Sequence, residues 1–238
     1  MISFIIPTLN EEKCLDKILS NLASYTGDKE IIVSDGNSKD RTVEIAKKYT
    51  DKVYVYTGQA RQTIGMGKNL GAEHAVGEFL LFLDTDVRVP DINTFLPKAL
   101  AKFADPKLLA IGARLKVEKE HETWADLIVF SIVNIVFWLQ NNVLGRGAMS
   151  GEFQMFRTEA FRKIGGYNPK LVVTEDQEIF ANLAKIGKTR VFWDTLVYHS
   201  GRRAHKLGWP KLLWQWTANY FSVFIFKKSV SDEWKPIR

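Results

Sequence analysis

The sequence predicts an α/β fold in which a mostly parallel sheet carries helices on both faces. Short apolar runs alternate with segments of helical spacing through the first half of the chain, a pattern typical of parallel strands linked by helices. The chain has 238 residues, of which 46% are hydrophobic and 25% charged, and this suits one large globular domain. A C-terminal amphipathic helical segment completes the predicted fold.

The first half contains four expected strands, each a short apolar run. They cover residues 2–6, 30–34, 53–56 and 78–83. We expect a helix after Asn10, whose side chain can cap it, with Glu11 and Glu12 in its positive first turn. Two further helices are expected over residues 40–49 and 66–76.

The second half is less regular. Strands are expected at 108–117 and 153–156, and helices at 158–164 and 175–186. Residues 124–139 are very apolar, but this run is shorter than the about 20 residues that a membrane-spanning helix needs. We therefore expect a buried or interfacial helix there, followed by a glycine-rich loop at 141–151.

Three expected strands end in polar loops, at residues 8–11, 35–37 and 84–86. In open sheets of this kind, ligands bind in the crevice outside the carboxyl ends of the strands. The sequence therefore predicts that these three loops face one crevice.

Asp84 and Asp86 follow a deeply apolar strand, one residue apart. Carboxylate oxygens are the ligands that Mg²⁺ and Mn²⁺ prefer, and such ions keep positions open for phosphate oxygens. An Asp-x-Asp pair can also simply end a strand. Two acids at this edge are costly without a partner, which favours a metal site.

The overall charge and the single cysteine limit the remaining function classes. A net charge of +6 suits phosphate-bearing ligands or anionic lipid surfaces, although it also serves solubility. We see no zinc-finger spacing, basic zipper or RNP-type motif, so nucleic acid is not an expected partner. Cys14 alone excludes an intrachain disulfide and a cysteine-based metal site, which fits a reducing compartment. The N-terminus lacks a basic region and a cleavage site, so we expect no signal peptide.

Five motifs occur in a fixed order along most of the chain. They are Ile-Ile-Pro-Thr-Leu-Asn-Glu at 5–11, Val-Ser-Asp-Gly-Asn-Ser-Lys-Asp-Arg-Thr at 33–42, Gly-Met-Gly-Lys-Asn-Leu-Gly-Ala at 65–72, Phe-Leu-Asp-Thr-Asp at 82–86, and Gly-Gly-Tyr at 165–167 with Thr-Glu-Asp at 174–176. Together they resemble the family 2 glycosyltransferases. The resemblance implies the GT-A fold, which is Rossmann-like, and the transfer of a sugar from a nucleotide-sugar donor.

The resemblance also implies roles at the donor site. Asp35 would accept a hydrogen bond from the nucleobase, although an Asp-Gly pair also commonly forms a turn. Asp84 would face the ribose or the metal, and Asp86 would bind the Mg²⁺ or Mn²⁺ that bridges the diphosphate. The other implied nucleotide-sugar contacts are Pro7, Thr8, Glu11, Lys68 and Thr85, with Lys68 adding charge near the base or phosphates.

A later segment of the chain also contributes to the implied donor site. His199 would be a further metal ligand, although a lone histidine is more often structural. Arg202 and Arg203 would hold the diphosphate, since guanidinium groups bind phosphate in a bidentate manner.

Asp176 is the implied general base of an inverting transfer, in which it takes a proton from the acceptor hydroxyl. The alternative is an ordinary helix start, where acids in the first turn are common. An acceptor phosphate would need no base, and Asp176 would then position the acceptor or the metal. Gly151, Glu152 and Glu175 are the implied residues of the acceptor side.

The C-terminal segment predicts contact with a membrane. Within residues 209–226 one helical stripe is polar, and it consists of Lys211, Gln215, Asn219 and Ser222. The rest of this segment is largely aromatic and aliphatic, and Lys227 and Lys228 follow it. Such a helix suits a membrane interface, although it could instead pack on the domain or on a partner subunit.

The expected organisation is a glycosyltransferase domain at 1–203 and a tail at 204–238. The domain divides into a nucleotide-sugar-binding half at 1–117 and an acceptor half at 118–203. We expect a cytoplasmic enzyme, peripheral on the membrane, that uses a UDP- or GDP-linked sugar and a lipid, polyprenyl phosphate or glycan acceptor.

Two other functions stay open on the sequence. A nucleotidyltransferase on a related sheet would have a glycine-rich, basic loop after the first strand, where this chain has Pro-Thr-Leu-Asn-Glu. A non-catalytic sugar-nucleotide-binding module would not need Asp176.

Overall fold

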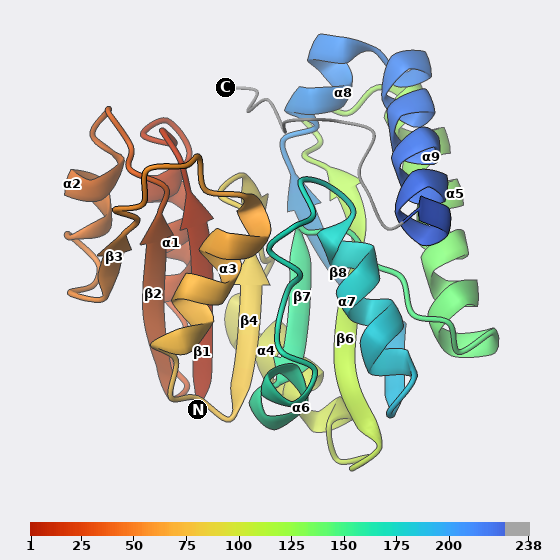
Figure 1. Cartoon of the computed structure of the whole chain (residues 1–238), viewed down its shortest axis with the longest axis horizontal. Coiled ribbons are helices and arrows are strands. Elements are labelled where there is room, and N and C mark those ends of the chain that lie inside the picture. The colour runs from red at the N-terminus through yellow and green to blue at the C-terminus, as the bar shows by residue number, and fades with distance from the viewer. Residues whose placement is uncertain (227–238) are drawn as a thin grey trace.

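The computed structural model describes residues 1–226, and within them eight strands form one sheet (Figure 1). The strands are β1 Ile2–Thr8, β2 Lys29–Asp35, β3 Val53–Val55, β4 Phe79–Leu83, β5 Val87–Arg88, β6 Leu108–Val117, β7 Phe153–Arg157 and β8 Lys188–His199. Their order is β3-β2-β1-β4-β7-β6-β8-β5. The first four pair in parallel, β6 and β8 are also parallel, and β7 and β5 pair antiparallel with their neighbours.

Helices cover both faces of this sheet, which confirms the predicted α/β architecture (Figure 1). Their bounds are α1 Leu15–Ala23, α2 Thr42–Ala46, α3 Ile64–Glu73, α4 Ile92–Lys102, α5 Trp124–Trp138, α6 Thr158–Lys163, α7 Glu175–Ala184, α8 Arg202–Leu207 and α9 Trp209–Phe226. A π-helical turn, η1 Leu139–Val143, continues α5.

The central strands are apolar because both of their faces are buried. Along β1, Phe4 and Ile6 pack with α1 and α4 in one apolar cluster, and Ile5 packs with α3, α6 and α7 in a second one. Along β4, Leu81 and Phe82 divide between the same two clusters. Side chains alternate between the faces of a strand, so a continuous apolar run is what a doubly covered strand requires.

The predicted capping of the first helix by Asn10 is wrong. α1 begins at Leu15, and Asn10 has φ 52°, in the left-handed region that asparagine tolerates. Its backbone N–H donates to Ser38 Oγ and its side-chain oxygen accepts from the Lys39 N–H. Asn10 therefore fastens the loop after β1 to the loop after β2, which shapes the crevice between them.

The predicted crevice depends on the register of the parallel strands. Thr8 at the end of β1 lies beside Asp35 at the end of β2, and β1 also pairs in parallel with β4. The three polar loops that follow these strands therefore leave the sheet at one edge, as predicted.

The apolar segment after β6 is longer than the sequence analysis expects. α5 and η1 together run from Trp124 to Val143, which is 20 residues, because a π-helical turn occupies the start of the expected loop at 141–151. By length and composition this helix could cross a membrane, and only 28% of its most apolar 18-residue stretch is buried.

Trp209, the first residue of α9, packs against Phe130 of α5, and one buried carboxylate joins α5, α8 and α9. Figure 1 shows these three helices at one end of the molecule. Asp126 caps α5 together with Thr123 and also accepts hydrogen bonds from His205 Nε2 at 2.8 Å and Trp209 Nε1 at 2.9 Å. The predicted domain boundary at 203/204 thus falls inside α8. Lys227 and Lys228, which the membrane prediction used, lie outside the described residues.

Candidate functional site

A cavity of about 1270 Å³ opens at the carboxyl ends of β1 and β4 and extends to α7 and α9. Every predicted site residue except Asp35 lines it. On the donor side these are Pro7, Thr8, Glu11, Lys68, Asp84, Thr85, Asp86, His199, Arg202 and Arg203. On the acceptor side they are Gly151, Glu152, Glu175 and Asp176.

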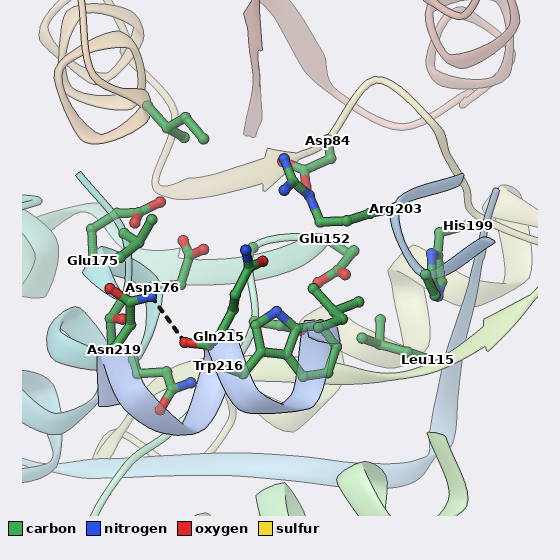
Figure 2. Close-up of a pocket in the computed structure, with 18 of the residues that line it drawn as sticks. Asp84, Leu115, Glu152, Glu175, Asp176, His199, Arg203, Gln215, Trp216 and Asn219 are labelled. Atoms are coloured by element: carbon green, nitrogen blue, oxygen red, sulfur yellow. Dashed lines mark hydrogen bonds between the residues drawn. The ribbon is translucent and has the colours of Figure 1, made fainter. Parts of the chain in front are cut away.

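Asp84 ends β4 at the centre of this cavity, beside Arg203 (Figure 2). Burial raises the pKa of its carboxyl to about 7; Lys68 opposes this shift, and the nearby acids Glu152 and Asp86 add to it. Burial, together with the neighbouring Arg202, lowers the pKa of Arg203 to about 10. Acidic and basic side chains thus lie close together around Asp84, and the charge of each group depends on its neighbours.

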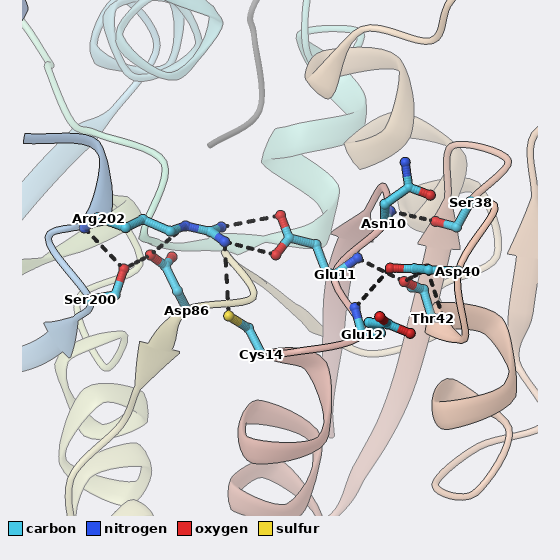
Figure 3. A network of polar contacts seen from close by, with 10 residues as sticks. All are labelled: Asn10, Glu11, Glu12, Cys14, Ser38, Asp40, Thr42, Asp86, Ser200 and Arg202. Atoms are coloured by element: carbon cyan, nitrogen blue, oxygen red, sulfur yellow. Dashed lines mark hydrogen bonds and ion pairs between the residues drawn. The ribbon is translucent and has the colours of Figure 1, made fainter. Parts of the chain in front are cut away.

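Asp86 is held by an arginine that crosses the mouth of the crevice (Figure 3). Arg202 Nε lies 3.1 Å from Asp86 Oδ2, and both terminal nitrogens of Arg202 bind the Glu11 carboxylate, at 2.9 and 3.2 Å. Ser200 also donates a hydrogen bond to Asp86. Burial opposes the charge of Arg202, but the bond to Glu11 and the attraction of Asp86 raise its pKa further.

The donor atoms fit a divalent cation through carboxylates alone. Among the described residues, no three histidine, cysteine or acidic groups lie together in a ready-made metal cluster. Mg²⁺ needs only one or two protein carboxylates when phosphates supply other ligands, and Asp84 and Asp86 can provide these. The buried Glu152 Oε2 has no hydrogen-bond partner within residues 1–226, and a bound cation would provide one.

His199 is buried at the end of β8, with 7% of its surface exposed. The Gly201 N–H donates to its Nδ1 at 3.2 Å, so the neutral ring carries its proton on Nε2. Nε2 has no partner in the described part of the chain, and the ring packs edge-on against Phe130 at 4.7 Å. Metal-binding histidines normally donate from their second nitrogen, so a metal at Nε2 would require the other tautomer. The metal role of His199 stays a prediction.

Asp35 is the predicted site residue that the structure places outside the cavity lining. It is fully buried, and its oxygens accept hydrogen bonds from Thr8 Oγ1 at 2.9 Å, from the Ser38 N–H at 2.7 Å and from Ser38 Oγ. It therefore organises the turn after β2. Its contact with a nucleobase stays a prediction.

The acceptor side is organised around a buried lysine. Lys68 of α3 is 1% exposed, its ammonium donates to Asp176 Oδ1, and it lies 3.6 Å from Glu175 Oε1. Thr174, at φ 70°, is a β-branched residue in the left-handed region, a strain of about 1–3 kcal/mol. This turn starts α7 so that Glu175 and Asp176 both face Lys68. The base or phosphate contact that the resemblance implies for Lys68 is not what its ammonium makes here.

Burial raises the pKa of Glu175 to about 8; the neighbouring Asp176 adds to the shift and Lys68 opposes it. Glu175 is therefore largely neutral at pH 7. Burial would lower the pKa of Lys68, but Asp176 and the other nearby acids raise it well above its usual value. Lys68 therefore stays charged, and its ammonium is paired with Asp176.

Gln62 and three residues of α9 also line the cavity, although they are not among the predicted site residues. Gln62 lines it near Pro7, and its buried Nε2 has no acceptor within the described residues; nothing in the local sequence pattern marked it. Gln215, Trp216 and Asn219 project from α9 into the same cavity (Figure 2). The polar stripe of α9 is the sequence signal for Gln215 and Asn219, but on the sequence it predicts a membrane-interface helix and not a wall of the site.

Comparison with known proteins points to one family. The chain matches the family described as "Glycosyl transferase family 2" over residues 3–165. It is 42% identical, over 92 residues, to a 4,4'-diaponeurosporenoate glycosyltransferase of Staphylococcus haemolyticus, covering 37% of this chain and 24% of that protein. It is 32% identical, over 140 residues, to the dolichyl-phosphate beta-glucosyltransferase ALG5A of Trichomonas vaginalis, covering 51% of this chain and 42% of that protein. The chain thus spans less than half the length of these curated relatives.

The fold is shared with solved structures of this kind. The mannosyltransferase PcManGT from Pyrobaculum calidifontis, solved in complex with GDP-Man and Mn²⁺, superposes with a TM-score of 0.74 at 19% sequence identity. The match covers 99% of this chain and 65% of that one. It confirms the fold predicted from the sequence.

Proposed function

This chain belongs to glycosyl transferase family 2, and on that premise we propose that it transfers a sugar from a nucleoside-diphosphate sugar to an acceptor with inversion at the anomeric carbon. The observation that carries the proposal is that Asp84 and Asp86, at the end of β4, and Asp176, at the start of α7, line one cavity. A donor bound across the sheet edge would then have its anomeric carbon between its diphosphate and Asp176.

The nucleoside would lie over the loops after β1 and β2. Pro7, Thr8 and Glu11 line that end of the cavity, and the Gln62 amide lies against Gly36 and Gly67 there. A Cβ on either glycine would lie only 3.2–3.3 Å from Gln62 Oε1, so the two glycines make room for this amide. Its unpaired donor suits a carbonyl oxygen of the base. UDP- and GDP-linked sugars are both candidate donors.

The diphosphate would lie between the aspartates and the arginines. Asp84 and Asp86 would hold Mg²⁺ or Mn²⁺, which when bound neutralises charge on the departing diphosphate. Arg203 would bind phosphate oxygens directly. Arg202 would do the same once it exchanges Asp86 for the donor's phosphate, since its planar fork binds both groups in the same way.

Asp176 would act as the general base toward an acceptor hydroxyl. Its side chain is 20% exposed and lines the cavity, whereas its neighbour Glu175 is 4% exposed. A hydroxyl that approaches Asp176 would attack the anomeric carbon opposite the diphosphate, and its proton would pass to the carboxylate. A phosphate acceptor is already ionised, and toward it Asp176 would only orient the attack.

The acceptor would be lipid-linked or close to a membrane, and the enzyme would sit peripherally on the cytoplasmic face. α9 turns Gln215 and Asn219 into the cavity and exposes Trp214, Phe221 and Ile225, at 67%, 56% and 64%. Large apolar side chains on an outer helix face suit a lipid interface. The relative described as a dolichyl-phosphate beta-glucosyltransferase supports a lipid phosphate acceptor.

The proposal is tested by donor binding and donor hydrolysis with Mn²⁺. A matching nucleotide sugar should raise the melting temperature, since a ligand at 100 times its Kd stabilises the folded state by about 2.7 kcal/mol. Asp86→Ala should remove the Mn²⁺-dependent part of both signals, and Asp91→Ala, outside the cavity, should leave them unchanged. Equal hydrolysis by wild type and Asp86→Ala would remove the metal site from the proposal.

The same screen separates the two other functions. A nucleotidyltransferase would form a nucleotide sugar from a nucleoside triphosphate and a sugar phosphate. A binding module would bind the donor and turn over none of it.

A further inference from the structure

The strongest unassigned feature is the buried contact between α3, from the donor half, and α7, from the acceptor half. Asn69 of α3 exchanges two hydrogen bonds with the backbone of Tyr167, at 2.7 and 2.9 Å. The Tyr167 hydroxyl donates to Gln154, and Gln154 Nε2 donates to the Asp176 carbonyl at 3.1 Å. Lys68 completes the contact through its ion pair with Asp176.

The Lys68 ammonium is buried and has three neighbouring groups. It lies 4.9 Å from the centre of the Tyr167 ring, 3.6 Å from Glu175 Oε1, and against Asp176 Oδ1. A fully buried charge is tolerated only when it is paired, and Asp176 is the partner that reaches the cavity. Lys68 therefore has little freedom to turn toward a nucleotide.

Gly151 packs against both members of the Lys68–Asp176 ion pair. A Cβ at this position would lie 2.6 Å from Asp176 Oδ2 and 3.2 Å from Lys68 Nζ. Only a residue without a side chain leaves room for the pair. Asp176 is therefore fixed by one oxygen on Lys68, while Oδ2 faces the space beside Gly151.

From this geometry we propose that Lys68 is the positioning residue of Asp176, holding Oδ1 so that Oδ2 is directed at the acceptor. This deepens the proposed function and rests on it. Lys68 belongs to α3, which borders the nucleotide end of the cavity. Its ion pair therefore also fixes the general base Asp176 relative to the donor half. A misplacement of a catalytic group by about 1 Å can cost about 100-fold in rate.

A double-mutant cycle tests the proposal with Lys68→Met, Asp176→Asn and the combined variant. Lys68→Met keeps most of the stem and removes the charge. We expect it to lower kcat by about 100-fold while the Kd of the donor nucleotide, measured by calorimetry, stays within threefold of wild type. The combined variant should be no slower than Asp176→Asn alone, since groups that act as a unit give non-additive losses.

Several results would overturn the proposal. A Lys68→Met variant with weaker donor binding and a normal kcat would assign Lys68 to the nucleotide. If the loss of kcat in the combined variant equalled the product of the losses in the two single variants, Lys68 would act independently of Asp176. If Lys68→Met fails to fold, Gly151→Ala displaces the Asp176 carboxylate with Lys68 retained, and an unchanged kcat in that variant refutes the idea. A wild type that binds donor but transfers to no acceptor would instead refute the proposed function itself.

Discussion

At the residue scale, one cavity contains carboxylates in very different electrostatic states. Asp84 is half-buried and Glu175 is buried, and loss of water contact raises their pKa values to about 7 and about 8. Asp86 and Asp176 each face a cation, Arg202 and Lys68. Burial and pairing thus give acids of the same chemistry different surroundings, and Asp176 is the carboxylate of the acceptor side that is both paired and open to the cavity.

Asp176→Asn should separate the proposed base from its neighbours on α7. We expect kcat toward a hydroxyl acceptor to fall by about 100-fold or more, with donor affinity unchanged, because the amide cannot take the proton. The matched control is Glu178→Gln, which alters a carboxylate two residues along the same helix that does not line the cavity. Initial rates of sugar transfer at saturating donor provide the measurement, and equal rates in both variants would contradict the role of Asp176.

At the element scale, α5, α8 and α9 depend on the Asp126 carboxylate. Burial alone would raise its pKa, but the hydrogen bonds from His205, Thr123 and Trp209 lower it below the ordinary 3.8. A carboxyl whose folded pKa is lowered stabilises the fold above its unfolded pKa, and that contribution is lost as the pH falls through the folded value.

Asp126→Asn should therefore be less stable than wild type at pH 7 by about 1–2 kcal/mol, the usual cost of a lost cap. The difference should shrink as the pH falls below 3.8, where the wild-type carboxyl also becomes neutral. Urea unfolding followed by tryptophan fluorescence across that range is the measurement. A difference that stays constant with pH would show that the charge of Asp126 plays no part.

α9 is an amphipathic helix that turns polar side chains toward the cavity and large apolar side chains outward, although Leu212 and Val223 are buried. Its polar residues Gln215 and Asn219 line the cavity, while Trp214 and Phe221 face outward. On a water-exposed helix the apolar stripe would face the core. The arrangement makes α9 a wall of the site and leaves it an apolar outer face, which the proposed lipid contact would use.

Trp214→Ser and Phe221→Ser should weaken the binding of lipid vesicles without changing the melting temperature, because both side chains are exposed. Val76→Ser is the matched control, since Val76 is 70% exposed but lies after α3 and away from this surface. Vesicle flotation compares the three variants. If the control weakens flotation as much as the α9 variants do, lipid contact through α9 is excluded.

At the scale of the whole molecule, the net charge of +6 would add a long-range attraction to the proposed membrane contact. Exposed apolar helices and a positive chain together favour anionic membranes, because electrostatic attraction and apolar burial add. Charge alone acts over about one Debye length, about 8 Å at physiological salt.

Binding should therefore be stronger to vesicles with anionic lipid than to neutral ones, and the difference should narrow as salt rises from 0.05 to about 0.5 M, where the Debye length shortens. Flotation of the full chain at each salt concentration is the test. Equal binding to both vesicle types at low salt would leave the apolar helices as the sole contact.

Much of the fold follows from the sequence because its signals are local. The strands that precede Thr8, Asp35 and Asp84 are apolar runs with polar ends, and any doubly covered parallel sheet requires that pattern. Two elements were not predicted because the local signals there point elsewhere. Pro97 lies inside α4, and a proline is usually a sign that a helix ends. Glycines after residue 144 predict a loop at 141–151, but a π-helical turn occupies its start.

The sequence by itself determined the fold class and the family, and it named fourteen of the residues that line the cavity. Only the tertiary structure decided what those residues contact: Asp35 turns inward to its own loop, Lys68 pairs with Asp176, and the polar stripe of α9 faces the site. Local patterns record which side chains are polar and where a strand ends. The partner of a buried polar group is set by elements far apart in the chain, since the cost of leaving it unpaired is met only once those elements pack together.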